Sequence, residues 1–433
     1  MILLNGIDIV KISRFEKIVT NSKLMKKLFS PSEITFFNSK KNPVQSAAAS
    51  FAAKEAFSKA LGTGIREFNL TDISVRHNSL GKPYFEFGET LREIIKKMGY
   101  ENFELSISHE KEYAVASVIA TGHTISQNER AYNECIKKFD GNYNIQCEII
   151  TPLKIKSVIT KRAENMHKGD AGRLVIIAGS KGLTGAALLS SKASLKCGAG
   201  LITLVCCESL NNIFETALPE VMTLPCRDTN GILNLDDIEK IFEKCQNCSA
   251  LLIGPGMGVT KDTQKILEYA VKNMCAPIII DADGINALSK NINILSGHKM
   301  PIIITPHIGE FARLTGLTAN EILSDTEKYA SKFAQKYDVT VILKSHRTVV
   351  AHKGKVYSNI LGNPGMATGG SGDVLSGCVA SFAAQFKNAE KAALAGVFIH
   401  SLSADMASCL IGEYGLTPTD ICNFLPYAIK YSQ

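Results

Sequence analysis

The stretch GNPGMATGGSGDVLSG, residues 362–377, combines a glycine-rich turn with an acid at its tip. Apolar residues at helical spacing follow Asp373, which predicts that Thr368 to Gly372 lie at the N-terminus of a helix. Free backbone N–H groups and the helix dipole make such an end an anion site without a lysine. A carboxylate there would repel a bound phosphate, so we interpret Asp373 as a base for a hydroxyl that attacks the phosphate. The alternative is a structural aspartate that the dipole stabilises.

Three further turns in the same region follow apolar strands. They are LLIGPGMG with Gly254, Gly256 and Gly258, IIIDADGIN with Asp281 and Asp283, and ITPHIGE with His307 and Glu310. Ligands of open α/β sheets bind at the carboxyl ends of the strands, so we expect these turns to converge on one crevice. Taken singly, each would be an ordinary turn or helix cap.

The N-terminal part of the chain holds a second set of groups suited to phosphates. Asp8 lies in the stretch GIDIV, while Glu55 and Lys59 lie one turn apart on a helix predicted over about residues 44–61 and ended by the glycines of 62–64. Two carboxylates with substrate phosphate oxygens are ligands that Mg²⁺ prefers, and Lys59 could reach the same phosphates. The alternative is an exposed ion pair worth about 0.3 kcal/mol.

The elements that must position these groups differ along the chain. From about residue 152 onward, apolar strands, Gly-rich turns and Ala-rich helices alternate, which predicts an α/β domain whose central sheet is mostly parallel and covered on both faces. The N-terminal part mixes short strands with Lys-rich helices, as in an α+β domain. We therefore predict domains over 1–120 and 151–433, joined by a polar linker over 121–150. The later strands are predicted at 174–178, 201–206, 250–253, 277–280, 302–305 and 340–343.

Composition excludes several protein classes. The 433 residues are 45% hydrophobic and 21% charged, as in ordinary globular proteins. A net charge of +7 without tryptophan does not favour nucleic acid as a partner. Apolar runs such as LVIIAG fall short of the roughly 20 residues that span a bilayer, and Asp8 comes too early for a signal peptide. Twelve cysteines without an export signal favour reduced thiols and a cytoplasmic location. The lone pair Cys245 and Cys248 lacks two of the ligands that zinc needs.

The motifs GIDIV, FSPSEI, FAAKEAFSKALGTG, GKPYF and LSISHEKEYAVASV occur in the order and spacing of the holo-acyl-carrier-protein synthases. Residues 1–120 resemble these 4′-phosphopantetheinyl transferases. The resemblance implies transfer of phosphopantetheine from coenzyme A to a serine of an acyl carrier protein. It implies Mg²⁺ on Asp8 and Glu55, catalytic roles for Glu55 and Lys59, and coenzyme A contacts from Lys82 and His109.

The same resemblance bears on partners. It implies a homo-oligomer with sites between subunits, and a first helical region that docks the acidic carrier protein. Arg14 and the lysines around it would supply complementary charge, although a charge run can also be just a solvated face. The alternative for the whole domain is a module that binds carrier protein without catalysis.

The stretch IIAGSKGLTGAALLS suggests a dinucleotide fold, because it follows a predicted strand and precedes a helix. The spacing of its glycines is G-x-x-G-x-x-G, formed by Gly179, Gly182 and Gly185, rather than G-x-G-x-x-G. Each glycine of the latter pattern is needed for a specific close approach at the pyrophosphate site. A nicotinamide dehydrogenase is therefore a weaker alternative for the C-terminal domain.

The motifs GPGMG, DADG, PHIGE and GGSGD together resemble those of the NAD(P)H-hydrate dehydratases, a branch of the ribokinase-like fold, from about residue 151 to the end. The resemblance implies repair of hydrated NADH or NADPH. The ring hydroxyl is phosphorylated by ADP, and phosphate is then eliminated, leaving AMP and phosphate. The alternative is a ribokinase-like kinase of a small alcohol that stops at the phosphorylated product.

The dehydratase resemblance also implies site residues, with Asp373 as the base. Contacts to the hydrated nucleotide would come from Ala186, Gly256, Gly258, His307 and Asp373, and contacts to the adenine nucleotide from Lys344, Ser345, His346, Arg347, Thr348 and Gly372. Ser345 departs from the glycine usual in the family, which puts affinity or nucleotide preference in doubt.

Overall fold

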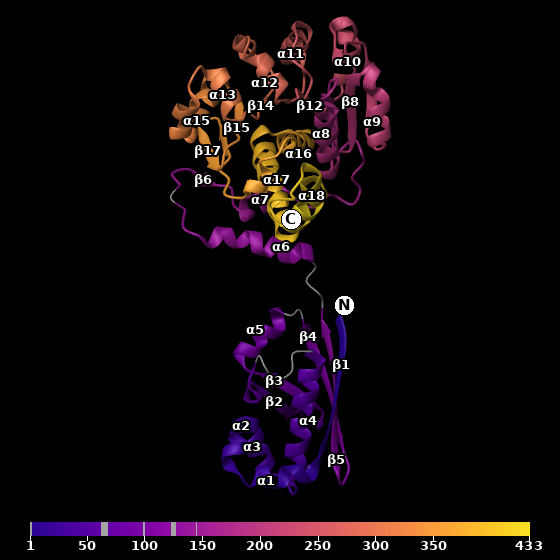
Figure 1. The fold of residues 1–433 in the computed structure, drawn as a ribbon, viewed down its shortest axis with the longest axis vertical. Helices are drawn as coiled ribbons and strands as arrows, with labels where there is room; N and C mark the ends of the chain where they lie inside the picture. The colour runs from indigo at the N-terminus through magenta and orange to yellow at the C-terminus, as the bar shows by residue number, and fades with distance from the viewer. Residues whose placement is uncertain (1, 62–67, 98–99, 123–126, 144) are drawn as a thin grey trace. The chain divides into compact units, whose positions relative to one another are not determined.

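The structure is a computed structural model that describes residues 2–61, 68–97, 100–122, 127–143 and 145–433. The chain divides into two compact units, Met1–Ser126 and Gln127–Gln433. Each unit has a hydrophobic core of its own. Figure 1 labels many of the helices and strands of both units.

The first unit is built on a three-stranded antiparallel sheet of order β1-β5-β4, formed by β1 (Ile2–Lys11), β5 (Tyr113–Gly122) and β4 (Tyr100–His109). Helix α4 (Pro43–Leu61) packs on one face of this sheet. The backbones of β1 and α4 lie very close together at Gly6, because a Cβ there would lie 2.0 Å from the backbone oxygen of Ala56. The predicted helix over 44–61 is confirmed, while the glycines at 62–64 lie outside the described residues.

The remaining elements of the first unit are short. Ser30 and Glu33 form a capping box at the start of α3, which fixes where that helix begins. The elements are η1 (Ile12–Phe15), α1 (Glu16–Val19), α2 (Ser22–Leu28), α3 (Pro31–Asn38), η2 (Leu70–Asp72), β2 (Ile73–His77), β3 (Pro83–Phe87) and α5 (Glu89–Lys97).

The second unit is built on a ten-stranded sheet of order β6-β17-β16-β15-β14-β13-β12-β7-β8-β9. The neighbours from β15 to β9 are all parallel, whereas β16 is antiparallel to both of its neighbours. The six strands predicted from sequence are all present, with ends shifted by one residue at most. The strands are β6 (Glu148–Ile149), β7 (Arg173–Ile177), β8 (Leu201–Cys207), β9 (Met222–Cys226), β12 (Ala250–Ile253), β13 (Ile278–Ile280), β14 (Ile302–Ile304), β15 (Thr340–Leu343), β16 (Val349–His352) and β17 (Lys355–Ser358).

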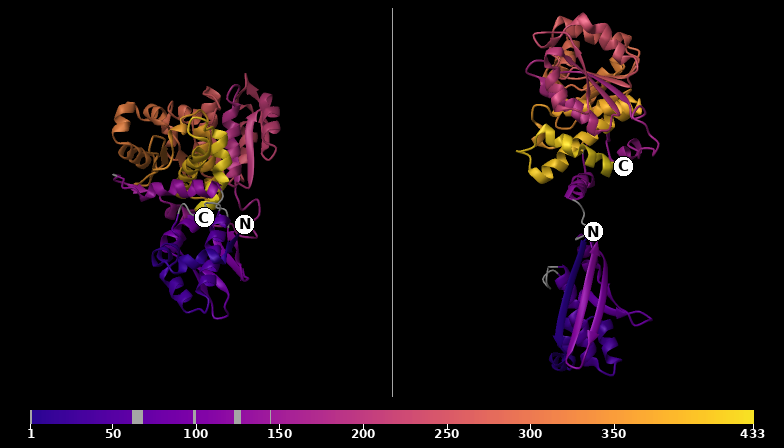
Figure 2. Two further views of the ribbon diagram at one scale, coloured as in Figure 1. Left: turned by 60° about the horizontal axis from the view of Figure 1, so that its bottom comes forward. Right: turned by 90° about the vertical axis from the view of Figure 1, so that its right-hand side faces the viewer.

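Both faces of the central part of this sheet are buried, which explains why strands such as β12, β13 and β14 are apolar along their whole length. Ile176 belongs to one core cluster and its neighbour Val175 to the other. The first cluster includes residues of α7 (Pro152–Val158), α8 (Thr184–Lys196), α9 (Asn211–Ala217), α16 (Ser371–Phe386), α17 (Ala389–Ile411) and α18 (Pro418–Ser432). The second includes residues of α10 (Ile238–Cys245), α11 (Lys261–Asn273), α12 (Asp283–Leu288), α13 (Ile308–Thr315), α14 (Ala319–Ser324) and α15 (Thr326–Tyr337). Figure 2 shows the sheet and its helices from two further sides.

One helix of the described residues, α17, is long and apolar enough to cross a bilayer, which the sequence inspection did not find. Its most apolar stretch is 78% buried inside the second unit, as in the core helix of a folded domain. In Figure 1 it lies beside α16 and α18.

Much of the stretch interpreted as a linker, 121–150, has regular structure in the second unit. Helix α6 (Gln127–Ile136) and the 3-10 helix η3 (Lys137–Asp140) follow the first unit directly. Ala131 and Cys135 are buried in the core beside α17 and α18. Their spacing of four residues gives one apolar stripe on an otherwise polar helix, which is why the composition indicated a linker.

Candidate functional sites

The glycine-rich loop ends at the N-terminus of α16, as the sequence predicts. Gly370 immediately precedes the helix with φ of 99°, a left-handed conformation that glycine adopts readily. Gly370 has no side chain to cap the helix, and the N–H of Ser371 donates to Thr368 O at 3.4 Å, which leaves the N–H groups of Gly372 and Asp373 to face an anion. Asp373 lies in this first turn. A Cβ added at Gly372 would lie 3.2 Å from Nζ of Lys344, so the loop meets the end of β15 there.

Lys344 is the cation of a cluster of acids at this edge of the sheet. Its Nζ donates a hydrogen bond to Oδ1 of Asp281 at 3.0 Å and lies 3.9 Å from Oε2 of Glu310. Thr305 Oγ1 donates to the same Asp281 oxygen at 2.7 Å, while Oδ2 of Asp281 is buried and has no hydrogen-bond partner among the described residues. Burial by itself lowers the pKa of Lys344, but the two carboxylates outweigh it and raise that pKa.

The acid cluster changes the charge state of Asp373. The pKa of its carboxyl is raised to about 7, first by burial and then by the negative charge of Asp281, whereas Lys344 opposes the rise. A carboxyl group with a pKa of about 7 is partly ionised at neutral pH, and its ionised form can accept a proton, as a general base requires.

His307 caps α13 and is held as a neutral ring. Its Nδ1 accepts the backbone N–H of Gly309 at 3.0 Å, and the backbone N–H of His307 donates to Oε2 of Glu310 at 2.8 Å. Burial lowers the pKa of His307, and the charges of Lys344 and Arg313 lower it further. Since Nδ1 accepts, the proton of the neutral ring lies on Nε2, 3.4 Å from Oε1 of Glu310.

The remaining turns reach the same edge. A Cβ at Gly256 would lie 3.0 Å from that of Ala186, so the turn after β12 touches the start of α8. The N–H of Gly258 donates to Oδ2 of Asp283 at 2.9 Å, which ties this turn to α12. The structure therefore brings together the glycine turns, the acids and the α16 loop, as the sequence predicts for one crevice.

The turn at 344–348 follows β15 at the same edge. Its backbone is fixed by the Lys344 N–H, which donates to Pro306 O at 2.8 Å, and by Thr348 O, which accepts from the N–H of Asn359 at 3.0 Å. Ser345 Oγ donates to Arg347 O at 2.6 Å, within the turn itself. This bond holds the Ser345 side chain against the backbone of its own turn. The side chains of His346 and Arg347 are exposed.

In the first unit, α4 carries Glu55 and Lys59 to the strand that holds Asp8. Lys59 Nζ donates to Oδ1 of Asp8 at 2.9 Å and to Ile7 O at 3.2 Å. Burial raises the pKa of Glu55, and the negative charge of Asp8 raises it further. The two carboxylates therefore lie near each other with a cation beside them, as the sequence predicts.

The described contacts do not join His109 and Lys82 to the carboxylates of Asp8 and Glu55 within one chain. His109 Nδ1 lies 2.9 Å from Nε2 of Gln45, which is ten residues before Glu55 on α4 and thus about 15 Å away along the helix axis. Lys82 forms an exposed ion pair of 2.7 Å with Glu104. The described contacts of one copy therefore join neither His109 nor Lys82 to the two carboxylates.

Sequence inspection missed a buried ion pair in the first unit. Lys54 Nζ donates to Oε2 of Glu33 at 2.7 Å, and both side chains are fully buried. Lys54 also donates to Leu28 O and Leu70 O, which joins α2, α3, α4 and η2. The signal in the sequence was weak, since Lys54 differs from the exposed lysines of the region only in lying on the alanine-rich face of α4.

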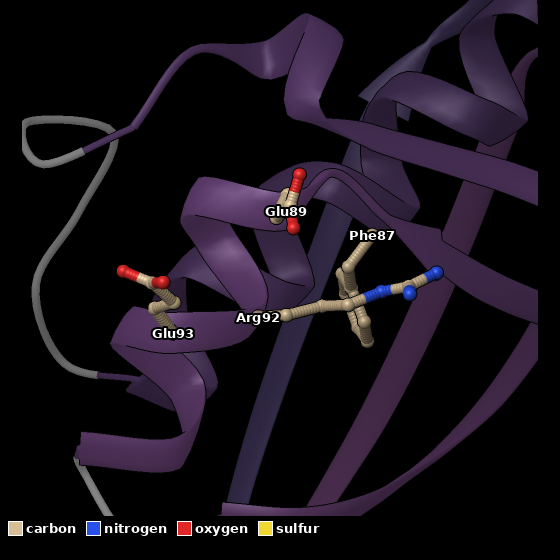
Figure 3. A pocket seen from close by; sticks show the side chains of 4 residues that line it. All are labelled: Phe87, Glu89, Arg92 and Glu93. Atoms are coloured by element: carbon tan, nitrogen blue, oxygen red, sulfur yellow. The ribbon is translucent and has the colours of Figure 1, made fainter.

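A hollow on α5 of the first unit is unrelated to these groups. It is lined by Phe87, Glu89, Arg92 and Glu93, and Figure 3 shows the charged side chains projecting from the helix. It shares no residue with the predicted sites and brings together no set of groups suited to catalysis, so we do not treat it as a candidate site.

Family comparisons divide the chain in the same way. Residues 174–427 match the model of the NAD(P)H-hydrate dehydratases, and residues 5–118 match that of the 4′-phosphopantetheinyl transferase superfamily. The first match covers more than half of the chain. The second supports the description of the first unit as similar to the holo-acyl-carrier-protein synthases.

Individual relatives resemble the larger unit. A bifunctional NAD(P)H-hydrate repair enzyme of Moorella thermoacetica is 37% identical over 284 residues, 65% of this chain and 54% of that enzyme. An ADP-dependent (S)-NAD(P)H-hydrate dehydratase of Listeria monocytogenes is 34% identical over 65% of this chain and 96% of its own length. A ribokinase-like protein of Enterococcus faecalis has a crystal structure with a TM-score of 0.60 at 30% identity, covering 67% of this chain and 99% of that one. The chain spans about half the length of the bifunctional relatives it matches.

Proposed function

The chain belongs to the NAD(P)H-hydrate dehydratase family, and we propose that its second unit dehydrates (6S)-NAD(P)H hydrate to NAD(P)H with ADP as the phosphate donor. The relative from Listeria is named for this ADP-dependent reaction, and this chain spans nearly all of it. The observation that carries the proposal is the carboxyl of Asp373, whose pKa is raised to about 7 at the N-terminus of α16.

The chemistry proceeds in two steps. Asp373 takes the proton of the ring hydroxyl, the hydroxyl oxygen bonds to the terminal phosphorus of ADP, and the bond from that phosphorus to AMP breaks. The first-turn N–H groups of α16 hold the transferring phosphate through the helix dipole. The carbon–oxygen bond of the ester then breaks, phosphate leaves, and loss of a ring proton restores the reduced nicotinamide. Neutral His307 and the turns at Gly256 and Gly258 line the space for the hydrated ring.

Two measurements test this proposal. Hydrated NADH and ADP are incubated with the full chain, and recovery of the reduced nicotinamide absorbance is followed together with AMP release. Asp373→Asn is expected to bind ADP yet give no recovery, since the amide cannot accept the proton. Accumulation of a stable phosphoester without recovery would instead support a small-alcohol kinase.

For the first unit we propose transfer of 4′-phosphopantetheine from coenzyme A to a serine of an apo acyl carrier protein. The serine oxygen bonds to the pantetheine phosphorus, and adenosine 3′,5′-bisphosphate leaves. The placement of Asp8, Glu55 and Lys59 at one end of α4 supports this, because the reaction must neutralise charge on a diphosphate.

Asp8 and Glu55 fit a magnesium ion. The negative charge of Asp8 contributes to the raised pKa of Glu55, so the two carboxylates repel each other and a cation between them would relieve that repulsion. Two carboxylates with diphosphate oxygens make a suitable ligand set for Mg²⁺, although no group of three or more ligating side chains occurs among the described residues. When bound, the ion would supply charge neutralisation on the diphosphate.

We further propose that the first unit acts as a homo-oligomer. His109 and Lys82 lie apart from the carboxylates within one chain, so a second copy could complete the site. The sheet face opposite α4 supports this, because it exposes the apolar side chains of Ile7, Ile9 and Ile119. Arg14 and its neighbouring lysines are exposed and would meet an acidic carrier protein.

Mass spectrometry tests the transfer. The full chain is incubated with coenzyme A, Mg²⁺ and apo acyl carrier protein, and the molecular mass of the carrier protein is then measured. A carrier that binds the chain but gains no mass would support a binding module instead. Asp8→Ala is expected to abolish the mass gain while nicotinamide repair continues, and loss of both activities would argue against independent units.

A further inference from the structure

A short segment that precedes the matched family region contacts both loops of the proposed ADP site. The segment, residues 137–143, comprises η3 and the three residues after it and lies outside the match that begins at 174. It is anchored by its neighbours, since α6 packs on α17 and the ring of Phe139 lies 6.1 Å from that of Phe398. Figure 1 shows α6 running along the second unit beside α18.

Lys138 holds the start of the glycine-rich loop. Its Nζ donates to Oδ2 of Asp405 at 2.8 Å and to Gly362 O at 3.2 Å. The Asp405 carboxylate also accepts the N–H of Gly362 and Nδ2 of Asn363, both at 2.9 Å. Only 4% of the Asp405 side chain is exposed. Charge-assisted bonds in such a setting are stronger than neutral ones, so the loop that leads to Asp373 begins at a fixed point.

Tyr143 contacts the other loop. Its hydroxyl donates to Lys138 O at 2.6 Å, which fixes the ring within the segment. The guanidinium carbon of Arg347, in the turn after β15, lies 5.8 Å from the centre of the ring. This distance is within the range of a cation–π contact. One segment of seven residues therefore touches the turn at 344–348 and the loop at 362–373.

We propose that residues 137–143 are a positioning segment that fixes the two ADP-binding loops of the second unit, with Lys138 and Tyr143 as its positioning residues. This rests on the ADP-dependent function proposed above. A loop that is already ordered loses less conformational freedom when the nucleotide binds, so the segment would raise affinity for ADP without touching the reacting atoms.

Hydrogen exchange measured by mass spectrometry tests the contact without nucleotide. Lys138→Met is expected to speed exchange in peptides that cover 362–373, while peptides from the central strands keep their rates. The matched control is Lys137→Met, because the adjacent Lys137 forms a surface ion pair with Glu134 and no other ion pair within the part of the chain that the structure describes. Lys138→Arg retains the charge and should restore the slow exchange.

The ADP dependence of the full chain gives the second readout. We expect Lys138→Met to raise KM for ADP about tenfold, the scale of one charge-assisted hydrogen bond, with a smaller change in kcat. Tyr143→Leu should also raise KM for ADP. Tyr132→Leu is its control, since the Tyr132 ring packs 5.4 Å from that of Tyr431, and its loss should lower stability without changing KM.

The outcomes separate this inference from the proposed function. A wild-type chain that neither binds nor uses ADP defeats the proposed function, yet the exchange rates of the Lys138 variants still decide whether the segment orders the loop. Unchanged exchange at 362–373 in Lys138→Met overturns the inference. An unchanged KM for ADP in both Lys138→Met and Tyr143→Leu, in an enzyme that is active, also overturns it. Equal changes of KM in Tyr143→Leu and Tyr132→Leu would show that the segment only stabilises the unit, which contradicts the inference as well.

Discussion

Nζ of Lys344 lies 3.0 Å from Oδ1 of Asp281, and this contact joins the ends of two strands, β13 and β15, that are separated in the sheet by β14. Lys344 is thus the cation beside the carboxylates of Asp281 and Glu310, and the Asp281 carboxylate is almost fully buried. Burial is the main cause of the raised pKa of Asp373, and this balance adjusts it further, since Asp281 raises that pKa and Lys344 lowers it.

The pH profile of nicotinamide repair should follow the ionisation of Asp373. Only the ionised carboxylate accepts a proton, so we expect the rate at saturating ADP to rise as the pH increases through about 7. Asp281→Asn removes a negative charge that raises the pKa of Asp373, and the rising limb should move to lower pH. The control is Glu268→Gln, which breaks a surface ion pair with Lys272 away from this cluster. An unmoved limb in Asp281→Asn would contradict this assignment.

Lys344→Met should destabilise the second unit. The substitution leaves Asp281 buried with only Thr305 as a described hydrogen-bond donor, and the loss of one partner of a buried ion pair costs about 3 kcal/mol. Urea denaturation followed by a probe in the second unit measures this change. Lys272→Met, which removes an exposed partner, should lower the free energy of unfolding by less than about 1 kcal/mol. Equal effects of the two substitutions would rule out a structural role for the Lys344 contact.

Lys54→Met should destabilise the first unit by a similar mechanism. The methionine leaves the carboxylate of Glu33 without its cation in a fully buried position, at a cost of about 3 to 5 kcal/mol. The double variant Lys54→Met with Glu33→Gln removes both charges and should recover part of the loss. Thermal unfolding of the three chains, followed in the first unit, measures the difference. A double variant less stable than Lys54→Met would show that the charge of Glu33 is not the cause.

Gly6→Ala should damage the first unit through a steric clash. The new Cβ would lie 2.0 Å from Ala56 O, so β1 and α4 must separate, and the contact between Asp8 and Lys59 would stretch. We expect lower stability of the first unit together with slower phosphopantetheine transfer. Gly88→Ala is the matched control, since its nearest neighbour would lie 3.6 Å away. Full transfer activity in Gly6→Ala would refute the tight packing of helix on strand.

Local pattern was sufficient for much of the fold. Strands buried on both faces form continuous apolar runs, so 250–253 and 340–343 could be predicted to the residue. Helix α6 could not be predicted from sequence, because its few apolar residues do not form a clear pattern and are recognised as buried only when the core against which they pack is known. Lys54 was missed for the same reason, since a lysine on an alanine-rich helix shows no sign in the sequence that a distant glutamate will neutralise it.

The sequence by itself determined which chemical groups are present and that they follow strand ends, because periodicity and turn residues are local properties of the chain. Only the tertiary structure decided how these groups act on one another. Distances between Lys344, Asp281 and Asp373 depend on strand order, and strand order is set by long-range packing. The pKa of a carboxyl depends on those distances and on burial, so the conversion of Asp373 from an ordinary acid into a candidate base is a property of the folded unit.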